Sequence, residues 1–262
     1  MMGAGLERCV VGSAALSTRR GFSGRLLGSL MAYGLIEGLW ARDLWAAKIK
    51  GTIGEWLRDL SERVRDLRDR RLTDVEFQDH LEGLFRRVDL AALTRLIDLD
   101  AVERRIGGGG SITDEVGLGV LPGLPTKVRF NRRLFVCGEG RSIVPHGHVN
   151  MCSGFLIIKG AWRGRHYDRL ETHADHCVVM PTIDEAFVAG DVSTVSDHRD
   201  NVHWFVAESR AAYIFNVHVA GYDPEIVERP GRLYLDPHGE VLAGGRIRAP
   251  RMTLAESRAK FG

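Results

Sequence analysis

The chain has 262 residues, of which 44% are hydrophobic and 27% are charged, a composition typical of globular proteins and unlike that of disordered or fibrous chains. Lysine and arginine number 36 against 34 acidic residues, so the formal net charge of +2 gives no reason to expect a nucleic acid or an anionic membrane as a partner. The four cysteines include no Cys-x-x-Cys pair, which argues against a structural zinc or a disulfide framework. One disulfide among Cys137, Cys152 and Cys177 is still compatible with this count.

Residues 1–47 contain a segment that fits two interpretations. Arg19 and Arg20 precede an apolar stretch over residues 26–40 in which only Glu37 is charged, and this order resembles a twin-arginine export signal. The alternative is an amphipathic first helix that packs on the rest of the chain. The apolar stretch is shorter than the roughly 20 residues that a membrane-spanning helix needs, so we expect no stable membrane span. A true signal implies a periplasmic or exported protein, and otherwise we expect a cytoplasmic one.

Residues 48–106 form a helical segment in our interpretation, because apolar residues recur there every three or four positions with charges between them. Thr73 and Glu76 have the spacing of a capping box, and Asp89 precedes a further short helical run, so we expect helices to begin at both places. The charges of residues 58–71 alternate in sign, which favours a solvent-exposed helix face over a surface for nucleic acid.

Four glycines at residues 107–110 mark a change from helical to strand-like sequence. We expect a barrel over residues 111–223, because many short β-type runs bounded by Gly, Pro, Asn or Asp favour an antiparallel sandwich or barrel. The runs cover residues 127–137, 154–160, 176–181, 187–195, 202–208 and 211–221. Residues 224–262 form a tail, in which we expect a hairpin that turns at residues 237–239 and then a short helix within residues 252–262.

His146 and His148 stand one residue apart just before a run that reads as a buried strand. Side chains at positions i and i+2 of a strand point to the same side, so both imidazoles are aimed at one place. His203 lies 55 residues after His148 in another strand-like run, and that length allows a few antiparallel strands to return the chain to the same wall. Three imidazoles that converge in this way predict a metal site, because neutral imidazole binds Fe, Zn, Cu and Ni.

The stretch from about residue 129 to residue 223 resembles a cupin, a double-stranded β-helix barrel whose first motif is G-x5-H-x-H-x3-4-E-x6-G. That motif is occupied here by Gly140, His146, His148 and Gly160. Ser153 stands where the glutamate would be, and His203 matches the histidine of the second cupin motif. The resemblance therefore implies a mainly β fold, a cupin double-stranded β-helix barrel with an α-helical N-terminal segment, and a three-histidine metal site.

Within the cupins, the three-histidine pattern is similar to the thiol dioxygenases, in particular the branch of cysteamine dioxygenase and the plant cysteine oxidases. Met151 follows His148 by three residues, and residues 201–207 match the pattern N-x-H-x-F-x-A of that branch. Tyr167 and Asp168 follow Gly160 at the spacing of its G-x6-Y-D. Residues 149–150 are Val-Asn where the branch has Pro-Gly. The resemblance covers about 95 residues and implies Fe(II) as the metal, with O2 and a small thiol compound as substrates.

Ligand chemistry alone leaves the metal and the activity open. Zn, Ni, Cu and Mn also bind such sites, and the general affinity order favours Cu or Zn over iron. Two further classes of function stay open beside the dioxygenase: a non-catalytic cupin that binds a metal or ligand, and a metal-dependent isomerase or hydrolase. Neither the oligomeric state nor the task of the N-terminal helices follows from the sequence.

Residues 164–171 supply the candidates for catalytic side chains around the metal. On a strand, Arg165 and Tyr167 share one face, and His166 and Asp168 share the other. An Arg–Tyr face would suit a substrate carboxylate, and a His–Asp face would orient a ligand or relay a proton, whereas an ion-pair ladder on the outside is the structural alternative. We predict catalytic roles for Tyr167, Arg165 and Asp168, and a loop over residues 196–201, shaped by Asn201, that presents His203.

The remaining cysteine and histidine candidates are expected to be structural. Cys152 lies close to the position of the missing glutamate, where a cysteine could be a ligand, a cross-linking partner or a bystander, and we expect it to pack against the next strand. The same structural role is expected for His173, His176, His198, His218 and His238.

Overall fold

The computed structural model describes residues 52–97, 99, 102, 111–115, 128–226 and 231–262. The chain divides into two compact units, Met1–Lys48 and Ile49–Gly262. The twin-arginine-like segment or first helix predicted for residues 1–47 lies outside the described residues, as does the glycine run at 107–110. The description that follows concerns the second unit.

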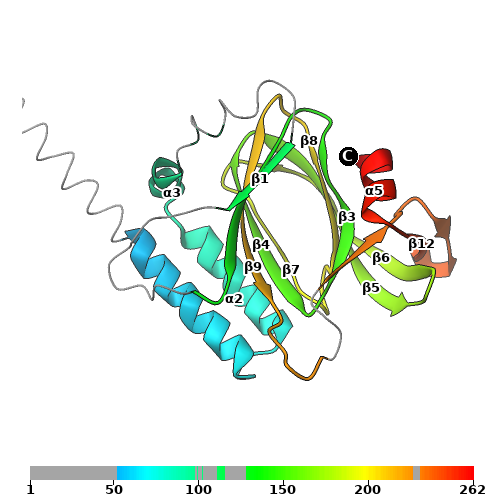
Figure 1. The fold of residues 1–262 in the computed structure, drawn as a ribbon, viewed down its shortest axis with the longest axis horizontal. Helices are drawn as coiled ribbons and strands as arrows, with labels where there is room; N and C mark the ends of the chain where they lie inside the picture. Colours follow the sequence, from blue (N-terminus) through cyan, green and yellow to red (C-terminus); the bar gives the residue numbers. More distant parts are fainter. Residues whose placement is uncertain (1–51, 98, 100–101, 103–110, 116–127, 227–230) are drawn as a thin grey trace, which may run out of the picture. The chain divides into compact units, whose positions relative to one another are not determined.

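Two antiparallel sheets face each other and form a barrel (Figure 1). The first sheet has the order β1 (Ser111–Glu115), β2 (Asn131–Cys137), β9 (Ala212–Ala220), β4 (Met151–Lys159) and β7 (Val192–Val195). The second has the order β10 (Gly231–Leu235), β3 (Ser142–Val149), β8 (Val202–Ala207), β5 (Ala161–Thr172), β6 (His176–Val188), β12 (Ile247–Met252) and β11 (Glu240–Val241).

The connectivity of β2 to β9 defines the class of fold. Apart from the β5–β6 hairpin, each step along the chain from β2 to β9 crosses from one sheet to the other. Each sheet therefore pairs strands that are distant in the sequence, which is the arrangement of the double-sheet jelly roll to which cupins belong. The predicted fold class is confirmed: a mainly β, cupin-type barrel with helices on its N-terminal side.

The helices begin where the sequence predicts them. Residues 52–68 are helical, and α2 (Asp74–Arg87) and α3 (Leu90–Leu96) follow. The hydroxyl of Thr73 accepts a hydrogen bond from Glu76 N at 3.2 Å, while the Glu76 carboxylate accepts one from Thr73 N at 2.8 Å. Asp89 Oδ1 accepts a bond from Ala92 N at 2.9 Å. These contacts satisfy backbone donors that the first turn of a helix leaves without partners.

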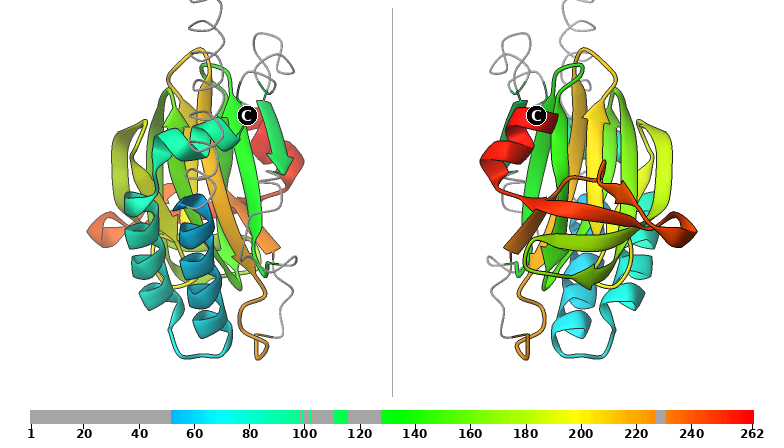
Figure 2. Two further views of the ribbon diagram at one scale, coloured as in Figure 1. Left: turned by 90° about the vertical axis from the view of Figure 1, so that its left-hand side faces the viewer. Right: turned by 90° about the vertical axis from the view of Figure 1, so that its right-hand side faces the viewer.

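The helices cover the outer face of the first sheet, on the left in Figure 1 and in front in the left view of Figure 2. Cys152, Leu156 and Ile158 of β4 belong to the hydrophobic cluster between this sheet and the helices, so Cys152 packs toward the helices and not into the metal site. Gly154 lies between them at the point of closest approach to α2. A Cβ atom at this position would meet the Phe85 ring and come within 2.9 Å of Leu81 Cδ2, so the helix can approach only a glycine here.

The opposite face of the same strand lines the barrel. Phe155 and Ile157 alternate with the helix-facing residues and join a second hydrophobic cluster inside the barrel. That cluster also contains Trp162 and Phe205 from the second sheet. The Phe155 ring lies 5.0 Å from that of His203, so this cluster directly contacts the histidines inside the barrel.

The C-terminal residues form strands that differ from the predicted hairpin. Strand β10 pairs with β3 and β12, and β11 pairs with β12, so no pairing joins β10 to β11 across residues 237–239. The prediction was wrong because β10 has a better partner in the open edge of β3, which a hairpin reading of local sequence does not see. The predicted terminal helix is confirmed as α5 (Leu254–Phe261), at the red end of the chain in Figure 2.

Two questions raised by composition are settled for the part of the chain that the structure describes. Cys137, Cys152 and Cys177 are buried thiols, and no disulfide joins them. Among the helices described, none is both long and apolar enough to cross a membrane.

Candidate metal centre

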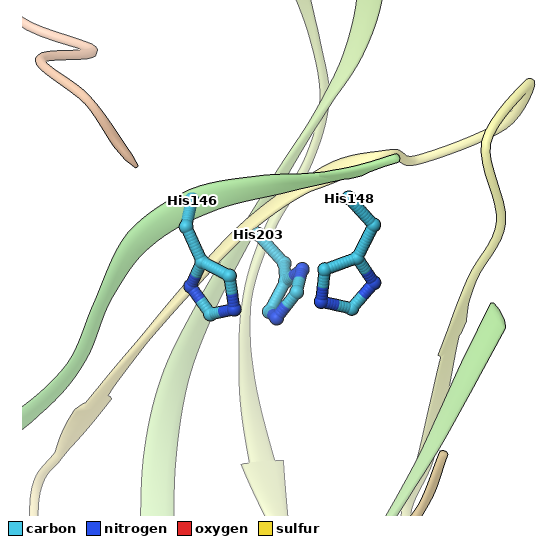
Figure 3. A group of neighbouring side chains, drawn as sticks. All are labelled: His146, His148 and His203. Atoms are coloured by element: carbon cyan, nitrogen blue, oxygen red, sulfur yellow. The ribbon is translucent and has the colours of Figure 1, made fainter. Parts of the chain in front are cut away.

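Three histidines from two neighbouring strands converge inside the barrel (Figure 3). β3 carries His146 and His148, β8 carries His203, and His146 and His203 are direct cross-strand partners. One ring nitrogen of each residue lies within 4.8 Å of the others. The ring centroid of His203 is 4.3 Å from that of His146 and 4.9 Å from that of His148. The predicted convergence of the three imidazoles is confirmed.

A β-bulge in β3 turns the histidine pair toward the interior. The register against β8 shifts between Ile143 and His146. Ile143 packs on the barrel-interior cluster, so strict alternation from this residue would place His146 on the outer face. The additional residue of the bulge reverses the alternation, and both His146 and His148 then face inward.

Burial keeps the three imidazoles neutral. Their exposed fractions are only 5%, 2% and 1% for His146, His148 and His203. This desolvation lowers the pKa of His146 to about 3, and it lowers the pKa values of His148 and His203 well below the usual value, with a further contribution from the neighbouring imidazoles. A neutral imidazole has a free lone pair, which is the form that binds a metal ion.

One hydrogen bond selects the ligand nitrogen of His146. Its Nδ1 lies 2.8 Å from the carbonyl oxygen of Val144. A carbonyl can only accept, so Nδ1 carries the proton and Nε2 keeps the lone pair. This is the usual way in which a protein orients a metal-binding histidine.

Asn201 ties the two ligand-bearing strands together. Its Nδ2 donates to His148 O at 3.0 Å and to Ser196 O at 3.0 Å, and its Oδ1 accepts from His148 N at 3.2 Å. The side chain therefore makes the backbone hydrogen bonds of His148 that a neighbouring strand would otherwise make. Its bond to Ser196 also closes the loop that leads to His203. Gly147 makes room for it, because a Cβ there would lie 2.6 Å from Asn201 Oδ1. The predicted role of Asn201 in shaping this loop is confirmed.

The donor set fits a metal ion better than a hydrogen-bonded cluster. Within the described part of the chain, no hydrogen bond joins any two of the three rings, although their nitrogens face one another. Ser153, at the position of the cupin glutamate, instead places its Oγ 3.1 Å from His218 Nδ1. The group can therefore hold a metal ion through three neutral nitrogen ligands, which suit Fe, Zn, Cu and Ni.

His166 extends the row of histidines across the second sheet. It is the cross-strand partner of His203 on β5, and the two ring centroids are 6.4 Å apart. Its Nε2 lies 2.9 Å from Ser193 Oγ, and burial lowers its pKa to about 3. Of the two faces considered for residues 164–171, the face of His166 is the one that looks inward.

The three residues predicted to be catalytic lie away from the histidines. Arg165 stacks on Trp204 at 4.6 Å and pairs with Asp184, and Tyr167 packs in an outer cluster with Val202. Both are cross-strand neighbours of outward-facing residues of β8, which places them on the outer face. Asp168 Oδ1 accepts a bond from Asp200 N at 2.7 Å and so supports the loop before His203. None of the three lines the pocket described next, so the structure offers no contact for their predicted catalytic role.

The histidines open into a pocket of about 770 Å³, a volume typical of small-molecule sites. His218 also lines it, with its ring 5.9 Å from that of His148, although the sequence led us to expect a purely structural residue. A signal for this position exists in residues 213–219. Asn216 and His218 are polar at alternate positions of a strand whose other face, with Tyr213, Phe215, Val217 and Val219, belongs to the hydrophobic cluster, so they mark a polar inner wall.

Comparison with known proteins adds nothing at the level of sequence, since neither family models nor curated proteins match this chain. Among solved structures, procruciferin, an 11S globulin from Brassica napus, matches 41% of this chain and 23% of its own with 10% identity and a TM-score of 0.30. A cupin superfamily protein from Desulfitobacterium hafniense matches 42% of this chain and 77% of its own with 14% identity and a TM-score of 0.29. An oxalate oxidase matches 48% of this chain and 55% of its own with 16% identity and a TM-score of 0.34. At such TM-scores, the assignment of the fold rests on the strand order itself.

Proposed function

We propose that this protein is an Fe(II)- and O2-dependent dioxygenase that acts on a small thiol compound. The observation that carries the proposal is the donor set: three buried, neutral imidazoles, with no aspartate or glutamate in the lining of the pocket. Three neutral ligands leave Fe(II) its full double charge, which favours an anionic donor such as a thiolate. They also leave coordination positions open for O2 and the substrate.

Each part of the pocket has a task in this proposal. His146, His148 and His203 would hold the iron, and Asn201 would keep the two ligand-bearing strands in register. Bound Fe(II) would supply the activation of O2 and the binding of the thiolate. The apolar side chains at the base of the pocket, such as Phe155, would exclude bulk water, which strengthens electrostatic interactions within the site.

The motif resemblance to the thiol dioxygenases supports the choice of iron and of a thiol over the other metals and substrates. Affinity order by itself favours Cu or Zn at three imidazoles, so the metal has to be tested directly. A non-catalytic ligand-binding cupin and a metal-dependent isomerase or hydrolase are the outcomes that the experiment has to separate from a dioxygenase.

The test is O2 uptake by protein loaded anaerobically with Fe(II). We expect uptake on addition of a thiol from a panel that includes cysteine, cysteamine and 3-mercaptopropionate, with both atoms of labelled O2 recovered in a sulfinate product. His203→Ala should abolish uptake, and the exposed control His80→Gln should retain it. Unchanged O2 with every thiol would refute the proposal. Turnover that persists without oxygen and with Zn would instead identify an isomerase or hydrolase.

A further inference from the structure

The wall of the pocket beyond the three histidines is strongly positive. Its lining contains the four arginines Arg133, Arg141, Arg232 and Arg258. No aspartate or glutamate lines it, so no acidic side chain of the lining compensates these charges. Arg141 is partly engaged, because its guanidinium donates to Gly262 O at 3.4 Å, and Gly262 itself lies in the lining.

Arg133 and Arg232 approach the pocket from opposite sheets. Arg133 lies on β2 of the first sheet, and Arg232 lies on β10 of the second, directly across from His148. Arg232 is exposed and has no ion-pair or hydrogen-bond partner among the described side chains. Arg133 is half-buried, its cross-strand neighbours are Asn216 on β9 and Glu115 on β1, and it makes no ion pair with a described side chain. Cations that line a cavity are available for an anion.

His218 lines the same pocket as the two arginines. Arg133 is the cross-strand neighbour of Asn216, which precedes His218 by two residues on the inner face of β9. The Nδ1 atom of His218 faces Ser153 Oγ at 3.1 Å, and the ring lies 5.9 Å from that of His148. A group bound beside His218 therefore lies next to the three-histidine site, within the length of a small molecule.

We propose that Arg133 and Arg232, beside His218, bind a carboxylate of the substrate, so that the substrate is an anionic thiol carboxylate and not a thiol amine. Guanidinium groups bind carboxylates through paired, charge-assisted hydrogen bonds. The same charges repel an ammonium group, so the pocket selects against cysteamine-like compounds by repulsion as well as by attraction. Apolar lining residues such as Phe135, Ile143 and Leu254 accommodate the carbon chain. The thiol part of this inference rests on the proposed function, whereas the carboxylate part does not.

The test compares ligands that share a thiol and differ in charge. Calorimetric titration of Zn-loaded protein with 3-mercaptopropionate, 2-mercaptoethanol and cysteamine should show the anion binding tightest, by about tenfold or more over the neutral compound. Propionate and propylamine, which lack the thiol, should differ in the same direction. Equal binding of the three thiols, or a preference for cysteamine, would overturn the proposal.

Variants assign the preference to particular residues. Arg232→Ala and Arg133→Ala should each weaken binding of 3-mercaptopropionate by about tenfold while leaving 2-mercaptoethanol unchanged, and Arg232→Lys should retain part of the affinity. Arg163→Ala is the matched control, because Arg163 pairs with Asp184 away from this pocket. Circular dichroism verifies that each variant folds. Loss of affinity that is equal for charged and neutral thiols would contradict the assignment.

These readouts separate the two proposals. Selective carboxylate binding without O2 uptake by the Fe(II)-loaded protein would leave the anion site in place and refute the dioxygenase. O2 uptake that is fastest with cysteamine, together with unselective binding, would retain the dioxygenase and refute the anion site.

Discussion

Burial separates the histidines of this protein into two groups. Of the ten, five are buried, and these line the barrel interior or its pocket: His146, His148, His166, His203 and His218. Burial lowers the pKa of an imidazole, so that the neutral ring can act as a metal ligand or hydrogen-bond partner. An exposed imidazole does not experience this desolvation. The chemistry of the site therefore depends on which side of a strand each histidine occupies.

Removal of one imidazole tests the metal site at the residue scale. We expect His203→Ala to abolish stoichiometric binding of Co(II) or Fe(II), because two ligands from a single strand cannot enclose an ion. Metal analysis after gel filtration and the absorption spectrum of Co(II) measure this. His80→Gln provides a control with an exposed histidine. Full metal content in His203→Ala would show that the ion is held elsewhere.

Asn201 should control metal affinity without touching the metal. Asn201→Ala removes the three hydrogen bonds that join the loop before β8 to His148 and Ser196. Loss of such a supporting residue reduces metal affinity by about 10- to 100-fold. Competition with a chelator measures the affinity, and Asn131→Ala, at the exposed first residue of β2, is the matched control. An unchanged metal affinity would mean that the strands position the ligands without the hydrogen bonds of Asn201.

At the scale of elements, two local irregularities place the site. The bulge between Ile143 and His146 turns the histidine pair inward, and Gly154 allows α2 to pack directly on β4. Because β4 has one face against the helices and the other in the barrel, the same strand supports Ser153 in the pocket wall. The packing of the helices thus determines the position of one side of the site.

A pair of glycine-to-alanine variants tests this packing, since the two should act in opposite directions. Gly154→Ala places a methyl group against Phe85 and Leu81 and should lower the free energy of unfolding by about 1–3 kcal/mol. Gly83→Ala lies within α2, where no atom comes within 4 Å of the new Cβ, and should raise it by about 0.5–1 kcal/mol. Denaturant titration measures both. Equal effects would contradict the close approach at Gly154.

At the scale of the whole second unit, the barrel carries a layer on each outer face. The helices share one hydrophobic core with the first sheet. Phe261 of α5 packs against Trp204 on the outside of the second sheet. The buried histidines lie between these layers, so their protonation is coupled to the unfolding of the entire unit.

That coupling predicts a loss of stability in acid. The unfolded chain protonates its histidines near pH 6.5, whereas the folded pKa values of His146 and His166 are about 3. The unfolded state therefore binds more protons between these values, and the stabilisation is complete above about pH 6.5 and decreases as the pH falls toward 3. Each such histidine contributes a slope of about 1.4 kcal/mol per pH unit in this range.

The measurement is denaturant unfolding of metal-free protein at a series of pH values. His166→Gln keeps a group that can hydrogen-bond Ser193 and removes one titrating site. It should therefore reduce the slope of the free energy of unfolding against pH by about 1.4 kcal/mol per pH unit. His80→Gln should leave the slope unchanged. An identical slope in His166→Gln and the unaltered protein would show that His166 is not neutral and buried in solution.

The sequence alone determined the type of fold, the helix starts at Thr73 and Asp89, and the three metal-binding candidates. Each depends on local spacing: a capping box at Thr73, an N-cap at Asp89, short β-type runs, and a pair of histidines two residues apart. The tertiary structure decided which faces look inward. Arg165 and Tyr167 lie on the outer face, beside the outward-facing residues of β8. The pocket is lined instead by residues from distant parts of the chain: Arg133 and His218 of the first sheet and Arg232 on β10. A side chain's place in a barrel depends on bulges and on the strands paired beside it, and these are long-range contacts that no local pattern encodes.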